Sequence, residues 1–182
     1  MSQRLLIVGA GEYGLVAKEI ADETKAFDFV AFVDDRGRGV SENMSVLGTT
    51  EQLGDLAEEF DCAVVAIGNA RVRLHLLDRI RCETDFELVN LISPRAYVSA
   101  SAHIGEGCII EPMAVVHALC RIGDGCLVSA GAVVNHGAVL SNGVHVDCNA
   151  TVMADVCVPR GGEVQSNTAL AKSCLFTGEA SV

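Results

Sequence analysis

The fold is decided by a repeat in the second half of the chain. From residue 98 to residue 163 the sequence divides into the hexads VSASAH IGEGCI IEPMAV VHALCR IGDGCL VSAGAV VNHGAV LSNGVH VDCNAT VMADVC VPRGGE, and each begins with Val, Ile or Leu. The fifth position of each hexad holds Ala, Cys, Val or Gly. A six-residue period with one large and one small inward residue matches neither an α-helix nor an alternating strand, but three such hexads complete one coil of a triangular parallel β-helix. We therefore predict a β-helix domain over residues 92–182.

Residues 1–91 follow a different pattern. Short apolar runs occur at Leu5–Val8, Val30–Val33, Cys62–Ile67 and Phe86–Leu91. Between them, apolar residues recur at helical spacing, and Thr50 is placed to cap the second of these helices. Strands that alternate with helices form βαβ units with a parallel sheet. We expect a small Rossmann-like α/β domain of about four strands over residues 1–91.

Composition and charge exclude several classes of protein. Half of the 182 residues are apolar and 20% are charged, which excludes a disordered chain. The formal net charge of −11 disfavours nucleic acid and acidic membrane surfaces as partners. The longest apolar run, of about six residues, is far shorter than a membrane span. The eight cysteines contain no CxxC pair and the N-terminus begins as a strand, so we expect reduced thiols, no zinc site and a cytoplasmic location.

A glycine-rich loop follows the first apolar run. Gly9, Gly11 and Gly14 stand where a strand ends and a helix begins, and the free N–H groups at such a helix start bind phosphate. Asp34 lies 20 residues after Gly14, as does the acid that contacts the ribose in NAD-binding folds. A domain of about four strands suits a mononucleotide better, with Asp34 or Asp35 on its sugar or base. The alternative is a tight turn with a solvated acidic pair.

The five histidines are candidates for chemistry. His75 falls in a polar stretch of a predicted helix. His103 and His145 occupy the sixth position of their hexads, His117 the second and His136 the third. An imidazole titrates near neutral pH, which suits a base that removes a proton from an attacking amine or hydroxyl. The alternative for His136 is an ordinary imidazole on a loop.

A set of short motifs, taken together, characterises the chain. They are GAGEYG at 9–14, FVDD at 32–35, VLG at 46–48, AIGN at 66–69, and NH at 135–136 within the hexads. With them the chain resembles the sugar acetyltransferases of the left-handed β-helix superfamily, above all the sialic-acid O-acetyltransferases and the nucleotide-linked 4-amino-sugar N-acetyltransferases. The resemblance implies a homotrimer in which acetyl-CoA lies between neighbouring β-helices. It also implies that residues 1–91 bind a nucleotide-linked amino sugar, which is N-acetylated with His136 as the general base.

The resemblance assigns binding residues as well. The acceptor is expected to contact the first domain through Gly9, Gly11, Tyr13, Gly14, Asp34, Asp35, Gly68 and Asn69. Acetyl-CoA is expected to contact His145 and the basic residues Arg160 and Lys172. A backbone N–H, from Gly131 or Gly137, is expected to hold the tetrahedral oxyanion. No residue is assigned as a metal ligand.

Two residues depart from the family pattern. Gly137 stands where a carboxylate often follows the catalytic histidine, and Tyr13 stands where the amino-sugar enzymes often have a histidine. Three alternatives therefore stay open. They are O-acetylation of a sugar of the sialic-acid type, a non-catalytic nucleotide-sugar-binding protein, and, less favoured, a β-helix metalloenzyme such as a γ-type carbonic anhydrase, whose zinc ligands do not match the phases of these histidines.

Overall fold

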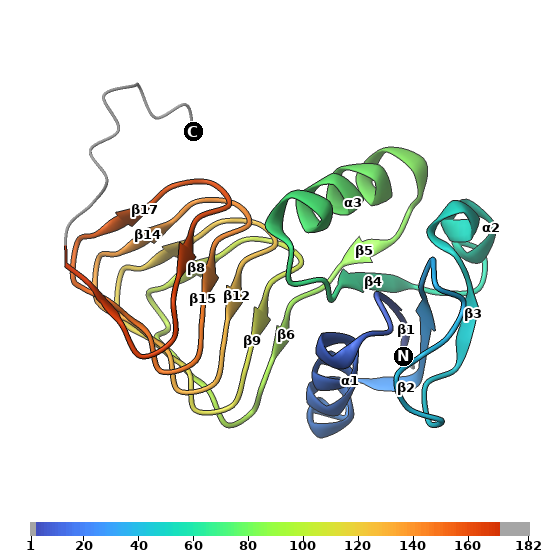
Figure 1. Cartoon of the computed structure of the whole chain (residues 1–182), viewed down its shortest axis with the longest axis horizontal. Helices are drawn as coiled ribbons and strands as arrows, with labels where there is room; N and C mark the ends of the chain where they lie inside the picture. The colour runs from blue at the N-terminus through green and yellow to red at the C-terminus, as the bar shows by residue number, and fades with distance from the viewer. Residues whose placement is uncertain (1–2, 172–182) are drawn as a thin grey trace.

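The computed structural model describes residues 3–171, which form a parallel α/β sheet joined to a stack of triangular coils (Figure 1). The strands of the sheet are β1 (Gln3–Val8), β2 (Phe27–Val33), β3 (Val46–Gly48), β4 (Cys62–Val65) and β5 (Glu87–Leu88), in the order β3-β2-β1-β4-β5 and all parallel. The predicted Rossmann-like arrangement is confirmed with one strand more than expected. The additional strand is β3, whose three residues are too few to produce a periodic signal in the sequence.

Helices cover both faces of this sheet. α1 (Glu12–Thr24) packs on one face, whereas α2 (Leu53–Leu56) and α3 (Ala70–Glu83) pack on the other. The residues of β1 alternate accordingly: Leu5 and Ile7 belong to the core under α1, and Leu6 and Val8 to the core under α3. All four are fully buried, as expected for a strand with helices on both faces.

The second predicted helix is shorter than expected. Thr50 begins a 3-10 helix (Thr50–Gln52) that continues into the single turn of α2. The backbone N–H and the hydroxyl of Thr50 both donate to Asp35 Oδ1 at 2.9 Å, so Thr50 ties this turn to the end of β2 instead of capping a long helix. Within residues 3–171, no helix is long and apolar enough to cross a membrane.

Two-residue strands build the β-helix. They are β6 (Leu91–Ile92), β7 (Tyr97–Val98), β8 (His103–Ile104), β9 (Ile109–Ile110), β10 (Val115–Val116), β11 (Arg121–Ile122), β12 (Leu127–Val128), β13 (Val133–Val134), β14 (Val139–Leu140), β15 (His145–Val146), β16 (Thr151–Val152), β17 (Cys157–Val158), β18 (Glu163–Val164) and β19 (Ala169–Leu170). They pair in parallel across three sheets. We call β6-β9-β12-β15-β18 the docking sheet, β7-β10-β13-β16-β19 the apolar sheet and β8-β11-β14-β17 the polar sheet. The hexad prediction is confirmed, and the aliphatic positions extend one step further at each end, to Ile92 and Leu170.

The two inward positions of each hexad fill the coils. Aliphatic side chains at the first position, such as Val128, and small ones at the fifth position, such as Ala132, are fully buried in one continuous core. Cys108, Cys120 and Cys126 are therefore small core residues, as predicted. At the corners, every sixth residue from 107 to 167 has a positive φ. Six of these eleven residues are glycines, because glycine adopts this conformation without strain.

The docking sheet joins the two parts of the chain. Its outward side chains Leu91, Ile109 and Leu127 are fully buried in the core that contains Leu5 and Ile7 of β1. An outward row of large aliphatic residues on one sheet alone therefore marks the face on which the α/β sheet packs. The burial of this row contributes hydrophobic stabilisation to the junction.

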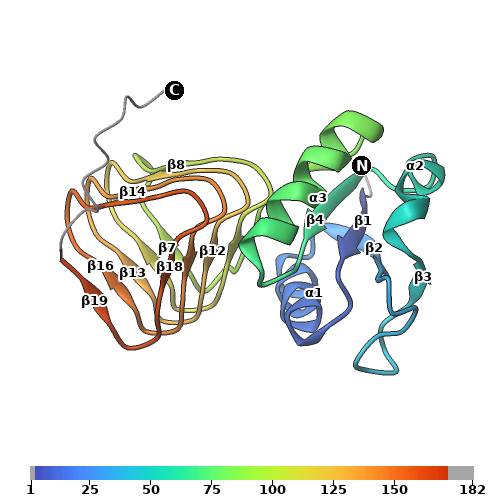
Figure 2. The ribbon, with the colours of Figure 1, turned by 45° about the horizontal axis from the view of Figure 1, so that its top comes forward.

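α3 lies along the corner between the polar and docking sheets (Figure 2). A Cβ on Gly107 would lie 2.8 Å from Leu77, and a Cβ on Gly143 would lie 2.6 Å from Leu74. A Cβ on Gly125, between them, would collide with Leu77. All three glycines have a positive φ. They therefore allow the left-handed turn and also leave room for the helix.

Arg73 of α3 is fully buried at this corner and connects both parts of the chain. Its Nε donates to the carbonyl oxygen of Gly125 at 2.7 Å, and its Nη2 donates to that of Gly143 at 2.8 Å. Its Nη1 donates to the carbonyl oxygens of Ile67 and Gly68, at 2.6 and 2.7 Å, in the loop before α3. One guanidinium thus satisfies four carbonyl groups.

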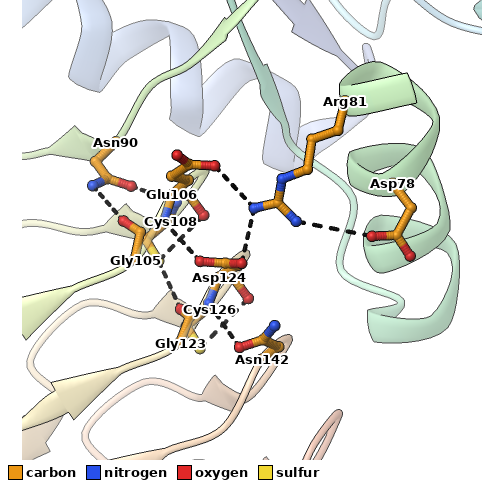
Figure 3. Close-up of polar contacts among 10 residues, drawn as sticks. All are labelled: Asp78, Arg81, Asn90, Gly105, Glu106, Cys108, Gly123, Asp124, Cys126 and Asn142. Carbon is orange, nitrogen blue, oxygen red and sulfur yellow. Dashed lines mark hydrogen bonds and ion pairs between the residues drawn. The ribbon is translucent and has the colours of Figure 1, made fainter. Parts of the chain in front are cut away.

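Arg81 makes a more exposed contact further along the same helix (Figure 3). Its Nη2 donates to Glu106 at 3.0 Å and to Asp124 at 2.8 Å, both in the corners of the β-helix. Its Nη1 lies 3.8 Å from Asp78. Beside this group, Asn90 donates to the carbonyl of Gly105 and accepts from a backbone N–H of the next coil, which fixes the start of the β-helix.

Candidate functional site

The glycine loop borders a cavity of about 390 Å³, lined by Gly9, Gly11, Glu12, Tyr13, Asp34, Arg36, Ala66, Ile67 and Gly68. Gly9 has φ +109°, and a Cβ there would lie 2.8 Å from the carbonyl oxygen of Ala66. A Cβ on Gly14 would collide with the carbonyl oxygen of Gly9. These two glycines therefore allow close backbone packing. Gly11 differs, because its Cβ would meet only Arg36 Nη2, at 3.3 Å.

Arg36 presents a positive charge beside the loop. Asp34 Oδ1 accepts from Nε of Arg36 at 2.9 Å, and Asp34 Oδ2 accepts from Nη2 at 3.0 Å. Asp34 Oδ2 also accepts from the backbone N–H of Ala10 at 2.8 Å. The hydrogen bond from Arg36 is the main cause that lowers the pKa of Asp34 to about 2, so this carboxylate stays ionised at physiological pH. Sequence analysis missed Arg36, although its position directly after the acidic pair was the available signal.

The predicted acceptor residues divide into two groups. Gly9, Gly11, Tyr13, Asp34 and Gly68 line the cavity together, whereas Gly14, Asp35 and Asn69 do not.

Two of the residues that do not line this cavity, Asp35 and Asn69, make hydrogen bonds that hold the fold. Asp35 accepts from Thr50 and lines an adjoining cavity of about 320 Å³, which shares Gly9 and Asp34 with the first. Asn69 is the N-cap of α3, and its side chain accepts from the N–H of Val72 at 3.1 Å. Both carboxylate oxygens of Asp34 are occupied as described, so the cationic group that faces the cavity is Arg36.

A polar row follows the corner between the docking and apolar sheets. Glu111, Ser129 and Asp147 occupy equivalent places in successive coils, directly after β9, β12 and β15. Glu111 is 8% exposed, and its Oε2 accepts from the N–H of Ala130 at 3.1 Å. His145 Nε2 lies 3.0 Å from Ser129 Oγ. Burial lowers the pKa of His145, so its neutral form is favoured.

Tyr13 crosses from the glycine loop to this row. Its ring packs in the core that also contains Ile109 and Leu127 of the docking sheet. Its hydroxyl is buried and has no hydrogen-bond partner within residues 3–171. Burial, and then the charge of Glu111, raise the pKa of Tyr13 well above its usual range, so the phenol is neutral. Sequence analysis did not place Glu111 beside Tyr13, although Glu111 repeats the hexad phase of Ser129 and Asp147.

His136 lies elsewhere on the molecule. It is an exposed residue at the corner between the apolar and polar sheets, which is the corner opposite the docking sheet. Its backbone N–H donates to Asn135 Oδ1 at 2.8 Å, and its carbonyl accepts from Asp155 N at 3.1 Å. One chain therefore does not bring His136 to the glycine loop, to Tyr13 or to His145.

The two glycines expected to hold an oxyanion are already engaged. The N–H of Gly131 donates to the carbonyl of Pro112 at 3.3 Å, and the N–H of Gly137 donates to that of Ala118 at 3.0 Å. Gly137 has φ +70°, and a Cβ there would collide with Asp155 Oδ1. A carboxylate side chain at position 137 would therefore require a left-handed backbone and would displace the side chain of Asp155.

The residues expected to contact acetyl-CoA also do not lie together in one chain. Arg160 borders a cavity of about 410 Å³ on the polar sheet, together with His103, Arg121 and Asn142. His145 is on the docking sheet and does not line this cavity. Lys172 lies outside the described residues. Within residues 3–171 there is no group of three or more His, Cys, Asp or Glu side chains that could hold a metal ion.

Similarity to known proteins covers both parts of the chain. Residues 4–80 match the family described as PglD N-terminal domain. The UDP-N-acetylbacillosamine N-acetyltransferase of Bacillus subtilis (strain 168) is 30% identical over 111 residues, which is 59% of this chain and 51% of that protein. The match thus spans about half the length of this curated relative.

Solved structures match over nearly the whole chain. The acetyltransferase domain of PglB from Neisseria gonorrhoeae FA1090 is 30% identical, with a TM-score of 0.81 over 96% of this chain and 94% of that one. The same domain in complex with acetyl coenzyme A has a TM-score of 0.76 over 93% and 88% of the two chains. A mutant of perosamine N-acetyltransferase from Caulobacter crescentus, in complex with CoA and GDP-perosamine, is 28% identical, with a TM-score of 0.67 over 91% and 90%.

Proposed function

This chain belongs to the family of hexapeptide-repeat sugar acetyltransferases, and from that membership we propose that it transfers the acetyl group of acetyl-CoA to the amino group of a nucleotide-linked amino sugar. The observation that carries the proposal is the cavity at the glycine loop, where a fixed guanidinium stands beside a helix start. In this proposal residues 1–91 bind the acceptor, residues 92–182 carry out the transfer, and the compartment is the cytoplasm.

The diphosphate of the acceptor is proposed to bind between Gly11 and Arg36. The first N–H groups of α1 have no partner within the helix, and they carry the positive end of the helix dipole. Arg36 bonds to Asp34 through Nε and Nη2, and the remaining N–H groups on Nη1 and Nη2 can donate to phosphate oxygens. Because Asp34 already holds the guanidinium in place, little side-chain entropy is lost when the phosphate binds.

His136 is the proposed general base. The neutral amine nitrogen of the acceptor attacks the thioester carbonyl carbon of acetyl-CoA, and the imidazole takes one proton from that nitrogen as the new bond forms. A C–N bond forms, the C–S bond breaks, and the proton leaves with the CoA sulfur as a thiol. For the oxyanion we propose the backbone N–H of Ala154, which lies one coil beyond His136 and makes no hydrogen bond within residues 3–171.

A second copy of the chain is proposed to complete the site, because His136 and the glycine loop lie on opposite sides of one prism. The apolar sheet and its corners carry exposed apolar side chains: Tyr97 is 58% exposed, Met113 68%, Leu119 69% and Met153 40%. Met113 and Leu119 also have a positive φ, which costs a bulky residue about 1 kcal/mol. Leu119 and Met153 lie at the corner of His136, whereas Met113 lies at the other edge of the apolar sheet, and packing between copies would bury all of these side chains. We propose the homotrimer of the family as the assembly.

Light scattering should give a mass near three times the 19.1 kDa of one chain. The double variant Met113→Asp, Leu119→Asp should shift the protein to monomers without unfolding it, because aspartate tolerates the left-handed conformation better than a large aliphatic residue. Acetyltransferase activity should fall as the trimer dissociates into monomers. A monodisperse monomer that retains full activity would contradict the shared site.

A nucleoside diphosphate should stabilise the protein. At about 100 times its dissociation constant, a ligand that binds only the folded state adds roughly 2.7 kcal/mol, which is visible as a rise in Tm. Gly11→Val should abolish the rise, because the new side chain fills the space in front of Arg36. Gly54→Val is the control, since a Cβ at Gly54 meets nothing within 4 Å and Gly54 does not line the cavity. If neither the diphosphates UDP, GDP and dTDP nor the monophosphate CMP raises the Tm, the glycine loop is a turn that does not bind phosphate.

The activity itself is tested by thiol release from acetyl-CoA with a panel of sugar nucleotides. Release with UDP-N-acetylbacillosamine or GDP-perosamine, together with an amide product in the mass spectrum, is the expected result. Release only with a sialic acid would assign the protein to O-acetylation. Nucleotide binding without release from any acceptor would assign it to non-catalytic binding.

A further inference from the structure

Asp155 places a carboxylate at the corner of His136, where the neighbouring position in sequence has none. The residue directly after His136 is Gly137, which has no side chain. A Cβ built on Gly137 would collide with Asp155 Oδ1, so this oxygen lies where a side chain of residue 137 would begin. The carboxylate of the next coil therefore fills the space that an acidic residue after His136 would occupy.

Backbone contacts hold Asp155 in this place. β16 pairs with β13 in parallel, and this register puts Asp155 opposite Gly137. The N–H of Asp155 donates to the carbonyl oxygen of His136 at 3.1 Å. Asp155 has a φ of +58°, a left-handed conformation that aspartate adopts more readily than most residues. The position of the carboxylate thus follows from the coil and from the residue type.

The carboxylate of Asp155 is free to take a partner. Asp155 is exposed, and neither of its carboxylate oxygens makes a hydrogen bond or ion pair within residues 3–171. The four segments of this corner, residues 99–101, 117–119, 135–137 and 153–155, contain no lysine or arginine. Their other titratable side chain is His117, whose ring lies edge-on to Tyr97. Within these segments no permanent cation competes with His136 for the carboxylate.

We propose that Asp155 is a positioning residue for His136, a role that rests on the proposed function. The two side chains are not bonded to each other in the structure, and the contact forms by rotation of the Asp155 side chain, which no hydrogen bond within residues 3–171 restrains. The carboxylate then accepts the N–H of one ring nitrogen of His136. The other ring nitrogen is left unprotonated and faces the acceptor, where it takes the proton of the attacking amine.

The negative charge has a second effect during the transfer. When the imidazole takes the proton it becomes an imidazolium, and an adjacent carboxylate stabilises that cation. Asp155 itself gains no proton, because it accepts a hydrogen bond from the ring throughout. It orients His136 and does not touch the reacting atoms.

The charge of Asp155 can be separated from its role in the turn. Asn149 occupies the equivalent place at another corner, with a φ of +56°, and a Cβ on Gly131 would collide with its Oδ1. The coil therefore accepts an asparagine in this conformation, above a glycine of the preceding coil. Asp155→Asn should keep the shape of the corner and remove only the charge.

Steady-state kinetics with acetyl-CoA and the best acceptor test the role of the charge. Asp155→Asn should lower kcat by about 10- to 100-fold, because misplacing a catalytic group by about 1 Å can cost 10²-fold. Both KM values, the Tm and the mass should stay unchanged. Asp124→Asn is the matched control, since Asp124 Oδ1 lies above Gly105 in the same way but at the corner beside α3, and it should keep kcat within about threefold.

Two double variants show whether the carboxylate acts through the imidazole. Adding Asp155→Asn to His136→Asn should lower kcat no further, whereas a structural defect would add its own loss. Asp155→Gly removes the carboxylate and opens the space above Gly137. Adding Gly137→Asp returns a carboxylate beside His136, in a residue type that tolerates the left-handed turn, and should raise kcat above that of Asp155→Gly.

Nuclear magnetic resonance provides a readout that does not depend on turnover. With CoA bound, the ¹⁵N resonances of the His136 ring should show one tautomer in the unmodified protein and a mixture of tautomers in Asp155→Asn. The same tautomer mixture in both proteins, or a kcat for Asp155→Asn within threefold of the unmodified protein, would overturn the inference. A single tautomer that depends on Asp155, without acetyl transfer to any acceptor, would instead refute the proposed function.

Discussion

His136→Asn should lower kcat by about 10²- to 10⁴-fold, the usual loss when a general base is removed. The side chain of His136 is exposed and makes no hydrogen bond within residues 3–171, whereas its backbone N–H and carbonyl are both bonded. The substitution therefore leaves the corner of the coil intact. Mass by light scattering, Tm, acetyl-CoA affinity and the affinity for a nucleoside diphosphate should all stay unchanged.

The matched control is His117→Asn. His117 is an exposed histidine at the same corner, one coil earlier, but at the second position of its hexad. Its ring lies edge-on to Tyr97, with 6.3 Å between the centroids. The control should keep activity within about threefold of the unmodified protein. Equal losses in both variants would indicate damage to the corner, and activity within threefold for His136→Asn would shift the base to another residue, with His145 the next to test.

The hexad repeat predicted the β-helix because each coil is determined locally. One aliphatic and one small inward residue recur every six positions, and both the period and the burial follow from a few neighbouring residues. The strand β3 could not be found in this way. It has three residues, and it exists because β2 offers it an edge to pair with. Strand pairing between segments that are distant in sequence produces no periodic pattern of apolar residues in the sequence.

The junction between the two parts depends on long-range contacts as well. In the sequence, Gly107, Gly125 and Gly143 are ordinary turn glycines, and nothing local indicates that Leu74 and Leu77 will pack against them. Only the position of α3 along the corner shows why these glycines recur once per coil: each leaves space for a leucine of the helix.

The candidate site was predictable to a similar extent. The glycine loop was found, because strand, glycines and helix are adjacent in sequence. Arg36 was missed, and Glu111 was not placed beside Tyr13, since both positions depend on contacts that are distant in sequence. Hexad position alone also does not show that the N–H groups of Gly131 and Gly137 bond to the preceding coil, whereas that of Ala154 makes no hydrogen bond within residues 3–171.

Arg73→Met should destabilise the protein more than any other single substitution considered. Methionine can occupy the volume of the arginine stem, but it leaves the carbonyls of Ile67, Gly68, Gly125 and Gly143 without their donors in a buried site. A buried acceptor left without its hydrogen bond costs about 1–3 kcal/mol, so the loss of the donors to four carbonyls is expected to cost at least about 3 kcal/mol in total. Urea unfolding followed by circular dichroism should give a loss of this size. A second, earlier transition should also appear if the α/β sheet separates from the β-helix before the coils unfold.

Arg81→Met is the matched control, because it removes an arginine that reaches the β-helix from the same helix but is more exposed. Arg81 is on the same helix and also reaches the β-helix, but its side chain is 34% exposed and its partners Glu106 and Asp124 can be solvated after the substitution. Exposed ion pairs contribute about 0–1 kcal/mol each, so a loss of no more than about 1 kcal/mol is expected. A similarly small loss for Arg73→Met would mean that the apolar row of Leu91, Ile109 and Leu127 holds the junction without the guanidinium. The difference between the two arginine variants therefore measures how far buried hydrogen bonds, rather than apolar contact, fix the glycine loop against the β-helix.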